Sequence, residues 1–128
     1  MNILLVDDDN TANFIAKRLI EKTFQSTTIN VAKNSKETLV NLKNQKDEFP
    51  NAIFLDINLG IENGWEILDK ILKLKEKGAI KKIPNIVILS SSIYDGDKEK
   101  AKEHENVVSY VSKPLSVDKL ENIKILLN

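Results

Sequence analysis

The sequence predicts an α/β fold, namely a doubly wound five-stranded parallel sheet with helices on both faces. Two observations predict it. Short runs rich in Ile, Val and Leu alternate along the chain with segments whose apolar residues recur at helical spacing. Three of the runs, ILLV, IFL and IVIL, are apolar throughout, which is typical of strands buried on both faces of a parallel sheet. The resulting order βαβαβαβαβα requires helical crossovers, and their right-handed connection covers both faces of the sheet.

Five runs are expected to form the strands. Four are strongly apolar, and a weaker one lies at Thr28–Ala32. The four strong runs are Ile3–Val6, Ile53–Leu55, Ile86–Leu89 and Val107–Val111. Pro84 lies at the start of one of these strands, where its missing N–H is tolerated.

The intervening segments are expected to be helices. Four of them carry an apolar face at 3.6-residue periodicity. The expected faces are Ala12, Ile15, Ala16 and Leu19; Leu39 and Leu42; Trp65, Leu68, Ile71 and Leu72; and Leu120, Ile123 and Leu127. The segment Asp95–Glu105 is almost entirely polar, so we expect a helix there from its position in the alternation rather than from its pattern.

Capping residues mark several helix ends. Asn34 and Asn63 are each followed three residues later by a glutamate, which is the spacing of a helix start. Ser116 is expected to cap the last helix, and Gly78 to end the third. The residues flanking the Ser116 cap, Leu115 and Leu120, have the spacing of a hydrophobic staple.

The composition limits the class of protein. The chain has 128 residues, the size of one domain, with 19 basic and 19 acidic residues and no cysteine. A net charge of zero argues against direct nucleic-acid binding, which usually needs a basic excess. The missing cysteines exclude a disulfide framework and a thiolate zinc site. No apolar run approaches the roughly 20 residues of a membrane span, and the N-terminus lacks the features of a signal peptide. A soluble cytoplasmic domain is therefore expected.

Polar side chains gather where the predicted strands end. Ligands of a doubly wound sheet bind beyond the carboxyl ends of its strands, so these positions are the candidates for chemistry. The first strand is followed by an aspartate triplet, and the third by a single aspartate. The fourth is followed by three serines, and the fifth by a lysine. The residues are Asp7, Asp8, Asp9, Asp56, Ser90, Ser91, Ser92 and Lys113.

Clustered carboxylates at this edge would repel one another unless a cation compensates them. Mg²⁺ prefers carboxylate, water and phosphate oxygens, and Lys113 supplies a second positive charge. One carboxylate, Asp56, can then act as a nucleophile and form an aspartyl phosphate, since phosphoryl transfer needs mainly alignment and charge neutralisation. A simpler interpretation is that Asp9 only caps the next helix, and that Ser90 and Lys113 are surface residues.

The motifs ILLVDDD, IFLDINL, NGWEIL, IVILSSS and YVSKP, taken with their spacing, resemble the receiver domains of bacterial two-component response regulators, the chemotaxis type. The resemblance covers the whole chain. It implies a flavodoxin-like (βα)5 fold with strand order 2-1-3-4-5. It also implies that residues 1–128 are one receiver domain without an output domain.

The resemblance also implies residue roles. The phosphoacceptor would be Asp56, with Lys113 and Ser90 as its catalytic partners and Ser91 as the small residue that follows. The magnesium ligands would be Asp7, Asp8, Asp56 and the backbone carbonyl of Asn58. Ser90 and Tyr110 would be the switch residues, while Asn58 and Ser92 would tune the lifetime of the phosphorylated state. The Lys113–Pro114 bond would be cis.

The chain departs from the family at Gly60, where a proline is common, and the loop around it is expected to be more flexible. Gly64 is expected to need its freedom of backbone angles. Two aromatic residues are expected to have no chemical role: His104 on the surface of a polar helix, and Trp65 in the packing of its own helix.

The implied function is a phosphoacceptor switch. A sensor histidine kinase or a histidine phosphotransfer protein would donate the phosphoryl group, and a downstream protein target would bind the altered surface. The resemblance implies neither nucleic acid nor membrane as a direct partner. The domain itself would be a signalling domain rather than an enzyme, with only weak self-phosphorylation and self-dephosphorylation.

Two alternatives remain open. A phosphatase of the haloacid-dehalogenase type would use Asp7 as its nucleophile and Asp9 as its acid–base residue. A binding module could share the architecture but signal without phosphorylation.

Overall fold

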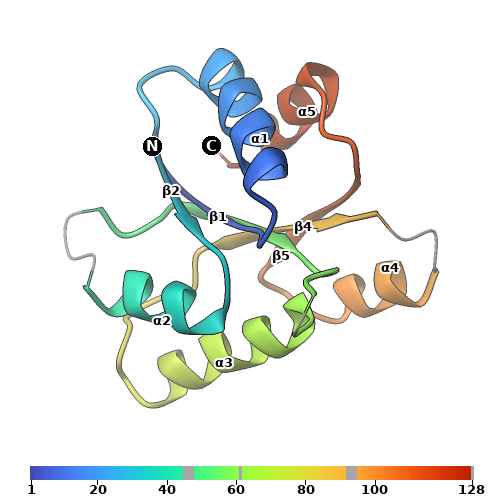
Figure 1. Ribbon diagram of the computed structural model, residues 1–128. Helices are drawn as coiled ribbons and strands as arrows, with labels where there is room; N and C mark the ends of the chain where they lie inside the picture. Colours follow the sequence, from blue (N-terminus) through green and yellow to red (C-terminus); the bar gives the residue numbers. More distant parts are fainter. Residues whose placement is uncertain (45–47, 61, 92–94, 128) are drawn as a thin grey trace.

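The computed structural model describes residues 1–44, 48–60, 62–91 and 95–127, and in these ranges strands alternate with helices (Figure 1). The strands are β1 (Asn2–Val6), β2 (Thr28–Ala32), β3 (Ala52–Asp56), β4 (Asn85–Ser90) and β5 (Val107–Ser112). The helices are α1 (Asn10–Thr23), α2 (Ser35–Asn44), α3 (Gly64–Glu76), α4 (Asp95–Lys102) and α5 (Val117–Leu127). All five predicted strands are confirmed, with ends extended by one residue at most.

The sheet has the order β2-β1-β3-β4-β5, and every neighbouring pair is parallel. This confirms the predicted doubly wound topology. Helices α1 and α5 cover one face of the sheet, and α2, α3 and α4 cover the other (Figure 1). The carboxyl ends of all five strands lie along one edge, because parallel strands point the same way.

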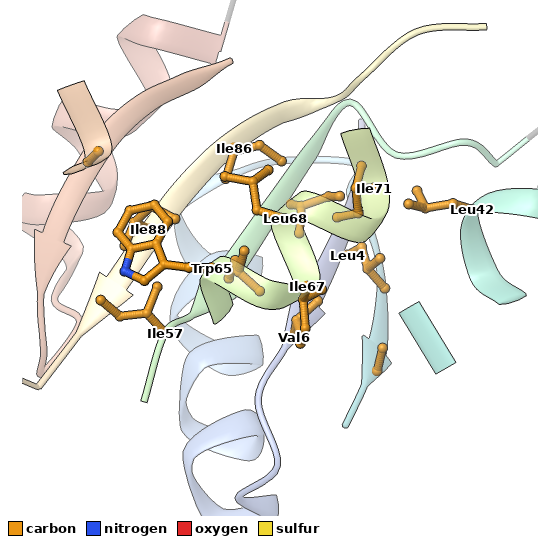
Figure 2. Packing of buried hydrophobic residues seen from close by; sticks show 14 of the residues in the cluster. Leu4, Val6, Leu42, Ile57, Trp65, Ile67, Leu68, Ile71, Ile86 and Ile88 are labelled. Carbon is orange, nitrogen blue, oxygen red and sulfur yellow. The ribbon is translucent and has the colours of Figure 1, made fainter. Parts of the chain in front are cut away.

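Alternate residues of the strands build two cores. In β1, Ile3 and Leu5 pack towards α1 and α5, while Leu4 and Val6 pack towards α2 and α3. On the second face, α3 supplies most of the helical contribution, and Figure 2 shows its side chains against those of β1 and β4. The labelled α3 residues are Trp65, Ile67, Leu68 and Ile71. Strands buried on both faces explain why their sequences lack alternation.

The predicted face of α1 is partly wrong. Ile15 is 52% exposed, whereas Ile20 is fully buried. The buried stripe also contains two polar residues, Asn13 and Thr23. The Asn13 side-chain amide donates to the Asp7 carbonyl oxygen at 2.9 Å, and the Thr23 hydroxyl donates to the Leu19 carbonyl oxygen at 3.0 Å. Hydrophobicity alone misplaced the face because these two polar residues are buried, although the Asn13 Oδ1 atom has no hydrogen-bond partner among the described residues.

The predicted helix ends are confirmed at several positions. The side-chain oxygens of Asn34, Asn63 and Ser116 accept backbone N–H groups at 2.8, 3.0 and 3.2 Å. Gly78 follows α3 with a φ of 78°, a conformation that favours glycine. The polar helix α4 is shorter than expected and ends at Lys102 instead of Glu105. None of the helices in the described ranges is long and apolar enough to span a membrane.

Candidate functional site

Three ionisable side chains meet at the carboxyl edge of the sheet. Asp7 directly follows β1, Asp56 is the last residue of β3, and Lys113 directly follows β5. The Lys113 Nζ atom lies 2.9 Å from Asp7 Oδ2 and 2.9 Å from Asp56 Oδ2. Both aspartates are 3% exposed. The structure therefore brings together residues that are up to 106 positions apart in the sequence.

The backbone around these residues is fixed by the ends of the strands. The Lys113 N–H donates to the Ser90 carbonyl oxygen at 2.8 Å, which extends the β4–β5 pairing by one residue. The next peptide bond, Lys113–Pro114, is cis, as the resemblance predicted. On β3, the Asn58 N–H donates to Asp56 Oδ1 at 2.8 Å, so each carboxylate oxygen of Asp56 has a hydrogen-bond donor.

Burial and charge act in opposite directions at this site. Desolvation raises the pKa of Asp56 and outweighs the lowering by Lys113 and by the Asn58 N–H, while the charge of Asp7 raises it further. Desolvation acts to lower the pKa of Lys113, but its hydrogen bonds to Asp7 and Asp56 outweigh burial and leave that pKa raised. The ammonium is therefore held charged between two carboxylates.

The third expected acid, Asp8, lies at the exposed rim of the site. Its Oδ2 atom accepts the Gly60 N–H at 2.9 Å. A proline at position 60 would lack this donor. The contact joins the Gly60 backbone to Asp8 at the rim of the site. The expected flexibility of this loop stays a prediction. Asp9, by comparison, caps α1 by accepting the Thr11 N–H at 2.9 Å, as the simpler interpretation of the triplet predicted.

Gly64 is needed for a reason that the sequence did not reveal. A Cβ atom at this position would lie 2.7 Å from the Asp56 carbonyl oxygen and 2.7 Å from Ile57 Cα. Its φ is not in the left-handed region, so the expectation of special backbone angles was wrong. The glycine instead allows α3 to begin in direct contact with the end of β3.

The side chain of Asn58 makes contacts that the sequence did not predict. Its Oδ1 atom accepts the Ser90 hydroxyl at 3.2 Å, the Ser91 N–H at 3.0 Å and the Ser91 hydroxyl at 3.3 Å. The sequence assigned a function only to its backbone carbonyl and to its position beside the site. No signal in a single sequence identifies which donors a loop amide will meet.

The donor set fits a hard divalent cation, although the described residues do not form a ready cluster of three acidic ligands. Asp7 and Asp56 already face a cation, the Lys113 ammonium, and Asp8 turns to Gly60. Mg²⁺ needs only one or two carboxylates and takes its remaining ligands from water and substrate oxygens. The carboxylate oxygens of Asp7, Asp8 and Asp56 are therefore suitable ligands for Mg²⁺.

Comparison with known proteins identifies the family. The family model described as "Response regulator receiver domain" matches residues 3–124. The chain belongs to the response-regulator receiver family. This receiver is 28% identical over 121 residues to the sensory transduction protein LytT of Bacillus subtilis, an alignment that covers 94% of the chain. The same alignment covers 45% of LytT, so the chain spans less than half the length of that relative.

Solved receivers share the fold. A two-component response regulator from Cytophaga hutchinsonii superposes with a TM-score of 0.85 at 29% identity, covering 98% of this chain and 95% of that chain. The Mn²⁺-bound form of response regulator Rcp1 superposes with a TM-score of 0.69 at 25% identity, covering 98% and 88%. The flavodoxin-like order of strands, implied by the resemblance, is therefore confirmed.

The expected switch residues of the receiver lie on neighbouring strands. Ser90 is the buried last residue of β4. Tyr110 is half-buried in β5, pairs in register with Ile88, and packs against the core on the α3 side. Ser92, expected beside the phosphoryl site, lies outside the described residues.

The expected surface position of His104 is wrong. His104 follows the end of α4 and is half-buried, and its ring stacks on the Trp65 indole with centroids 5.7 Å apart. The indole N–H donates to Asp97 Oδ1 at 3.1 Å, which links α3 to α4. Trp65 itself is 6% exposed and serves packing, as predicted.

Proposed function

We propose that this receiver is a phosphoacceptor switch of a two-component phosphorelay, with Asp56 as the acceptor. The observation that carries the proposal is the Lys113 ammonium between the buried carboxylates of Asp7 and Asp56, at 2.9 Å from each. A buried carboxylate with a compensating cation is a nucleophile that can take up a further negatively charged group.

In the proposed reaction, an Asp56 carboxylate oxygen attacks the phosphorus of a phosphohistidine in line. The new O–P bond forms as the N–P bond breaks, and the electron pair remains on the imidazole nitrogen. Lys113 balances the added charge, and the Ser90 hydroxyl and the Ser91 N–H donate to the phosphoryl oxygens. Water later attacks the phosphorus and releases inorganic phosphate, which regenerates the Asp56 carboxylate.

We propose Mg²⁺ as the cofactor. Its ligands would be Asp7, Asp8, Asp56 and the backbone carbonyl of Asn58, and the bound ion would neutralise charge on the phosphoryl oxygens. The Mn²⁺-bound form of Rcp1 supports a divalent ion in this family. The exposed rim position of Asp8 leaves its second carboxylate oxygen available to such an ion.

The proposed donor is a sensor histidine kinase or a histidine phosphotransfer protein, and the output is altered binding of a downstream protein. Tyr110 would change its burial when Ser90 moves towards the phosphoryl group. Both conformations would exist beforehand, and phosphorylation would shift their populations. We propose a cytoplasmic location, since the phosphohistidine donor is made there. Asp9, which the phosphatase alternative would use as its acid–base residue, accepts backbone N–H groups of α1 instead.

Intact-mass spectrometry tests the proposal. Incubation with Mg²⁺ and acetyl phosphate should add the mass of one phosphoryl group, and Asp56→Asn should abolish the gain. The matched control is Asp69→Asn, which changes an exposed aspartate of α3 and should leave the gain intact. A full gain in Asp56→Asn, or no gain in the wild type and control, would refute the proposal.

A further inference from the structure

The Asn58 amide oxygen occupies a point where three hydrogen-bond donors converge. Two come from hydroxyl groups, those of Ser90 and Ser91, and the third is the Ser91 backbone N–H. All three distances are between 3.0 and 3.3 Å. Converging donors of this kind are the arrangement that stabilises an anionic oxygen. Here they surround a neutral oxygen, which is a weaker acceptor than a charged one.

These donors lie next to the proposed nucleophile. The Asn58 N–H donates to Asp56 Oδ1 at 2.8 Å, so one residue contacts both the carboxylate and the donors. The preceding residue is also fixed, because the Ile57 N–H donates to the Leu89 carbonyl oxygen at 3.1 Å. The backbone of this segment is therefore held against β4, and the side chain of Asn58 reaches the end of that strand.

We propose that the Asn58 carboxamide is an internal stand-in for the phosphoryl group. In the unphosphorylated receiver it occupies the Ser90 and Ser91 donors, and it must leave them before a phosphoryl oxygen can bind there. The inference rests on the proposed function, because it assumes that a phosphoryl group on Asp56 is the competitor.

Two consequences follow from this competition. Binding of a phosphoryl oxygen has a free-energy cost, because the hydrogen bonds to Asn58 must break before the stronger hydrogen bonds to a charged oxygen replace them. Until the phosphoryl group arrives, the Ser90 hydroxyl donates to the Asn58 amide oxygen. The side chain of Asn58 thus sets the affinity of the site for its phosphoryl group, in addition to the role of its backbone.

Asn58→Ala separates the side chain from the backbone. The variant keeps the N–H that contacts Asp56 and the carbonyl proposed to bind Mg²⁺, and it removes the competing oxygen. The residue is exposed, so water can replace the lost contacts and the expected effect is moderate. A net loss of competition worth roughly 0.5–1 kcal/mol corresponds to about two- to fivefold tighter binding of a phosphoryl analogue.

The test is a titration of the full chain with beryllofluoride in saturating Mg²⁺, followed by the Ser91 amide resonance in ¹H–¹⁵N NMR spectra. Asn58→Ala should bind about two- to fivefold more tightly than the wild type. Its Mg²⁺ affinity is titrated separately, so that any effect on the proposed backbone ligand is distinguished from the loss of the competing amide oxygen. The matched control is Asn44→Ala, at the exposed end of α2, which should bind like the wild type.

A second variant protects the test against misfolding. Asn58→Ser ends its side chain before the position of the amide oxygen, and it should show the same tightening as Asn58→Ala. Unchanged or weaker binding in the folded variants would overturn this inference while leaving the proposed function intact. Absence of beryllofluoride binding in the wild type would instead overturn the proposed function, so the two failures are distinguishable.

Discussion

At the scale of single residues, Lys113 is the positive charge that faces both buried acids of the site. Its ammonium lies 2.9 Å from two carboxylates that are almost completely buried. Breaking a buried pair by removing one partner is costly, because the remaining charge is left without compensation. A single lysine therefore compensates the charges of two acids.

Lys113→Met should reduce the free energy of unfolding by about 2 kcal/mol, measured by urea denaturation in the absence of divalent ions. Adding Asp56→Asn to that variant should restore part of the loss, because one of the two uncompensated charges disappears. If Lys113→Met is as stable as the wild type, the ammonium does not compensate the two carboxylates as we describe.

At the scale of the elements, Glu62 links the β3–α3 connection to the start of α2. Its Oε1 atom accepts the Ser35 N–H at 2.6 Å, and its Oε2 atom lies 3.6 Å from Lys70 Nζ. Partial desolvation acts to raise the pKa of Glu62, but the Ser35 hydrogen bonds and the Lys70 charge outweigh it and leave that pKa lowered. The carboxylate therefore stabilises the fold most when it is ionised.

The stability that Glu62 contributes should be present above its unfolded pKa, about 4.3, and should be lost as the pH falls through its lower pKa in the folded state. Glu62→Gln should reduce the free energy of unfolding by about 0.5–1 kcal/mol at pH 7. The difference from the wild type should shrink towards pH 3 in urea denaturation. Glu76→Gln, at an exposed site on α3, is the control. A difference that grows towards low pH would contradict the assigned role.

Helix α4 is anchored to the rest of the receiver by a small set of contacts. Its sequence is almost entirely polar, and Ala101 is its member of the core cluster. The Trp65 indole N–H donates to Asp97 at 3.1 Å, and Lys100 lies over the same indole ring at 5.3 Å. The position of α4 therefore depends on Trp65 in α3, close to the loop that carries Asn58.

Trp65→Phe should destabilise the receiver by about 1 kcal/mol, since it removes the N–H donor and keeps an aromatic ring. In a double-mutant cycle with Asp97→Ala, urea denaturation should give a coupling energy of about 0.5–1 kcal/mol. Strict additivity of the two substitutions would show that the hydrogen bond does not hold α4 in place.

At the scale of the whole molecule, the sequence predicted the fold well because β1, β3 and β4 each contain an uninterrupted apolar run. Even the weaker run at Thr28–Ala32 forms an edge strand with the predicted bounds. The buried face of α1 could not be predicted, since it includes the polar residue Asn13, whose side-chain amide donates to the Asp7 backbone carbonyl. The hydrophobic pattern of the sequence thus predicts which segments are helices and strands. Buried polar residues determine in part which face of a helix packs on the sheet.

The same division applies to the site. The convergence of Asp7, Asp56 and Lys113 could be predicted, because topology alone brings strand ends to one edge. The contacts of the Asn58 side chain and the close approach at Gly64 could not, since both depend on loop geometry. Topology therefore predicts which residues meet, and the loops determine the hydrogen bonds that they make.

The most direct test of the central claim is to locate the phosphoryl group. After incubation with acetyl phosphate and Mg²⁺, borohydride reduction converts an aspartyl phosphate to homoserine, and peptide sequencing by mass spectrometry identifies the position. The account predicts homoserine at position 56 and at no other aspartate. Homoserine at position 7, 8 or 9 would contradict it.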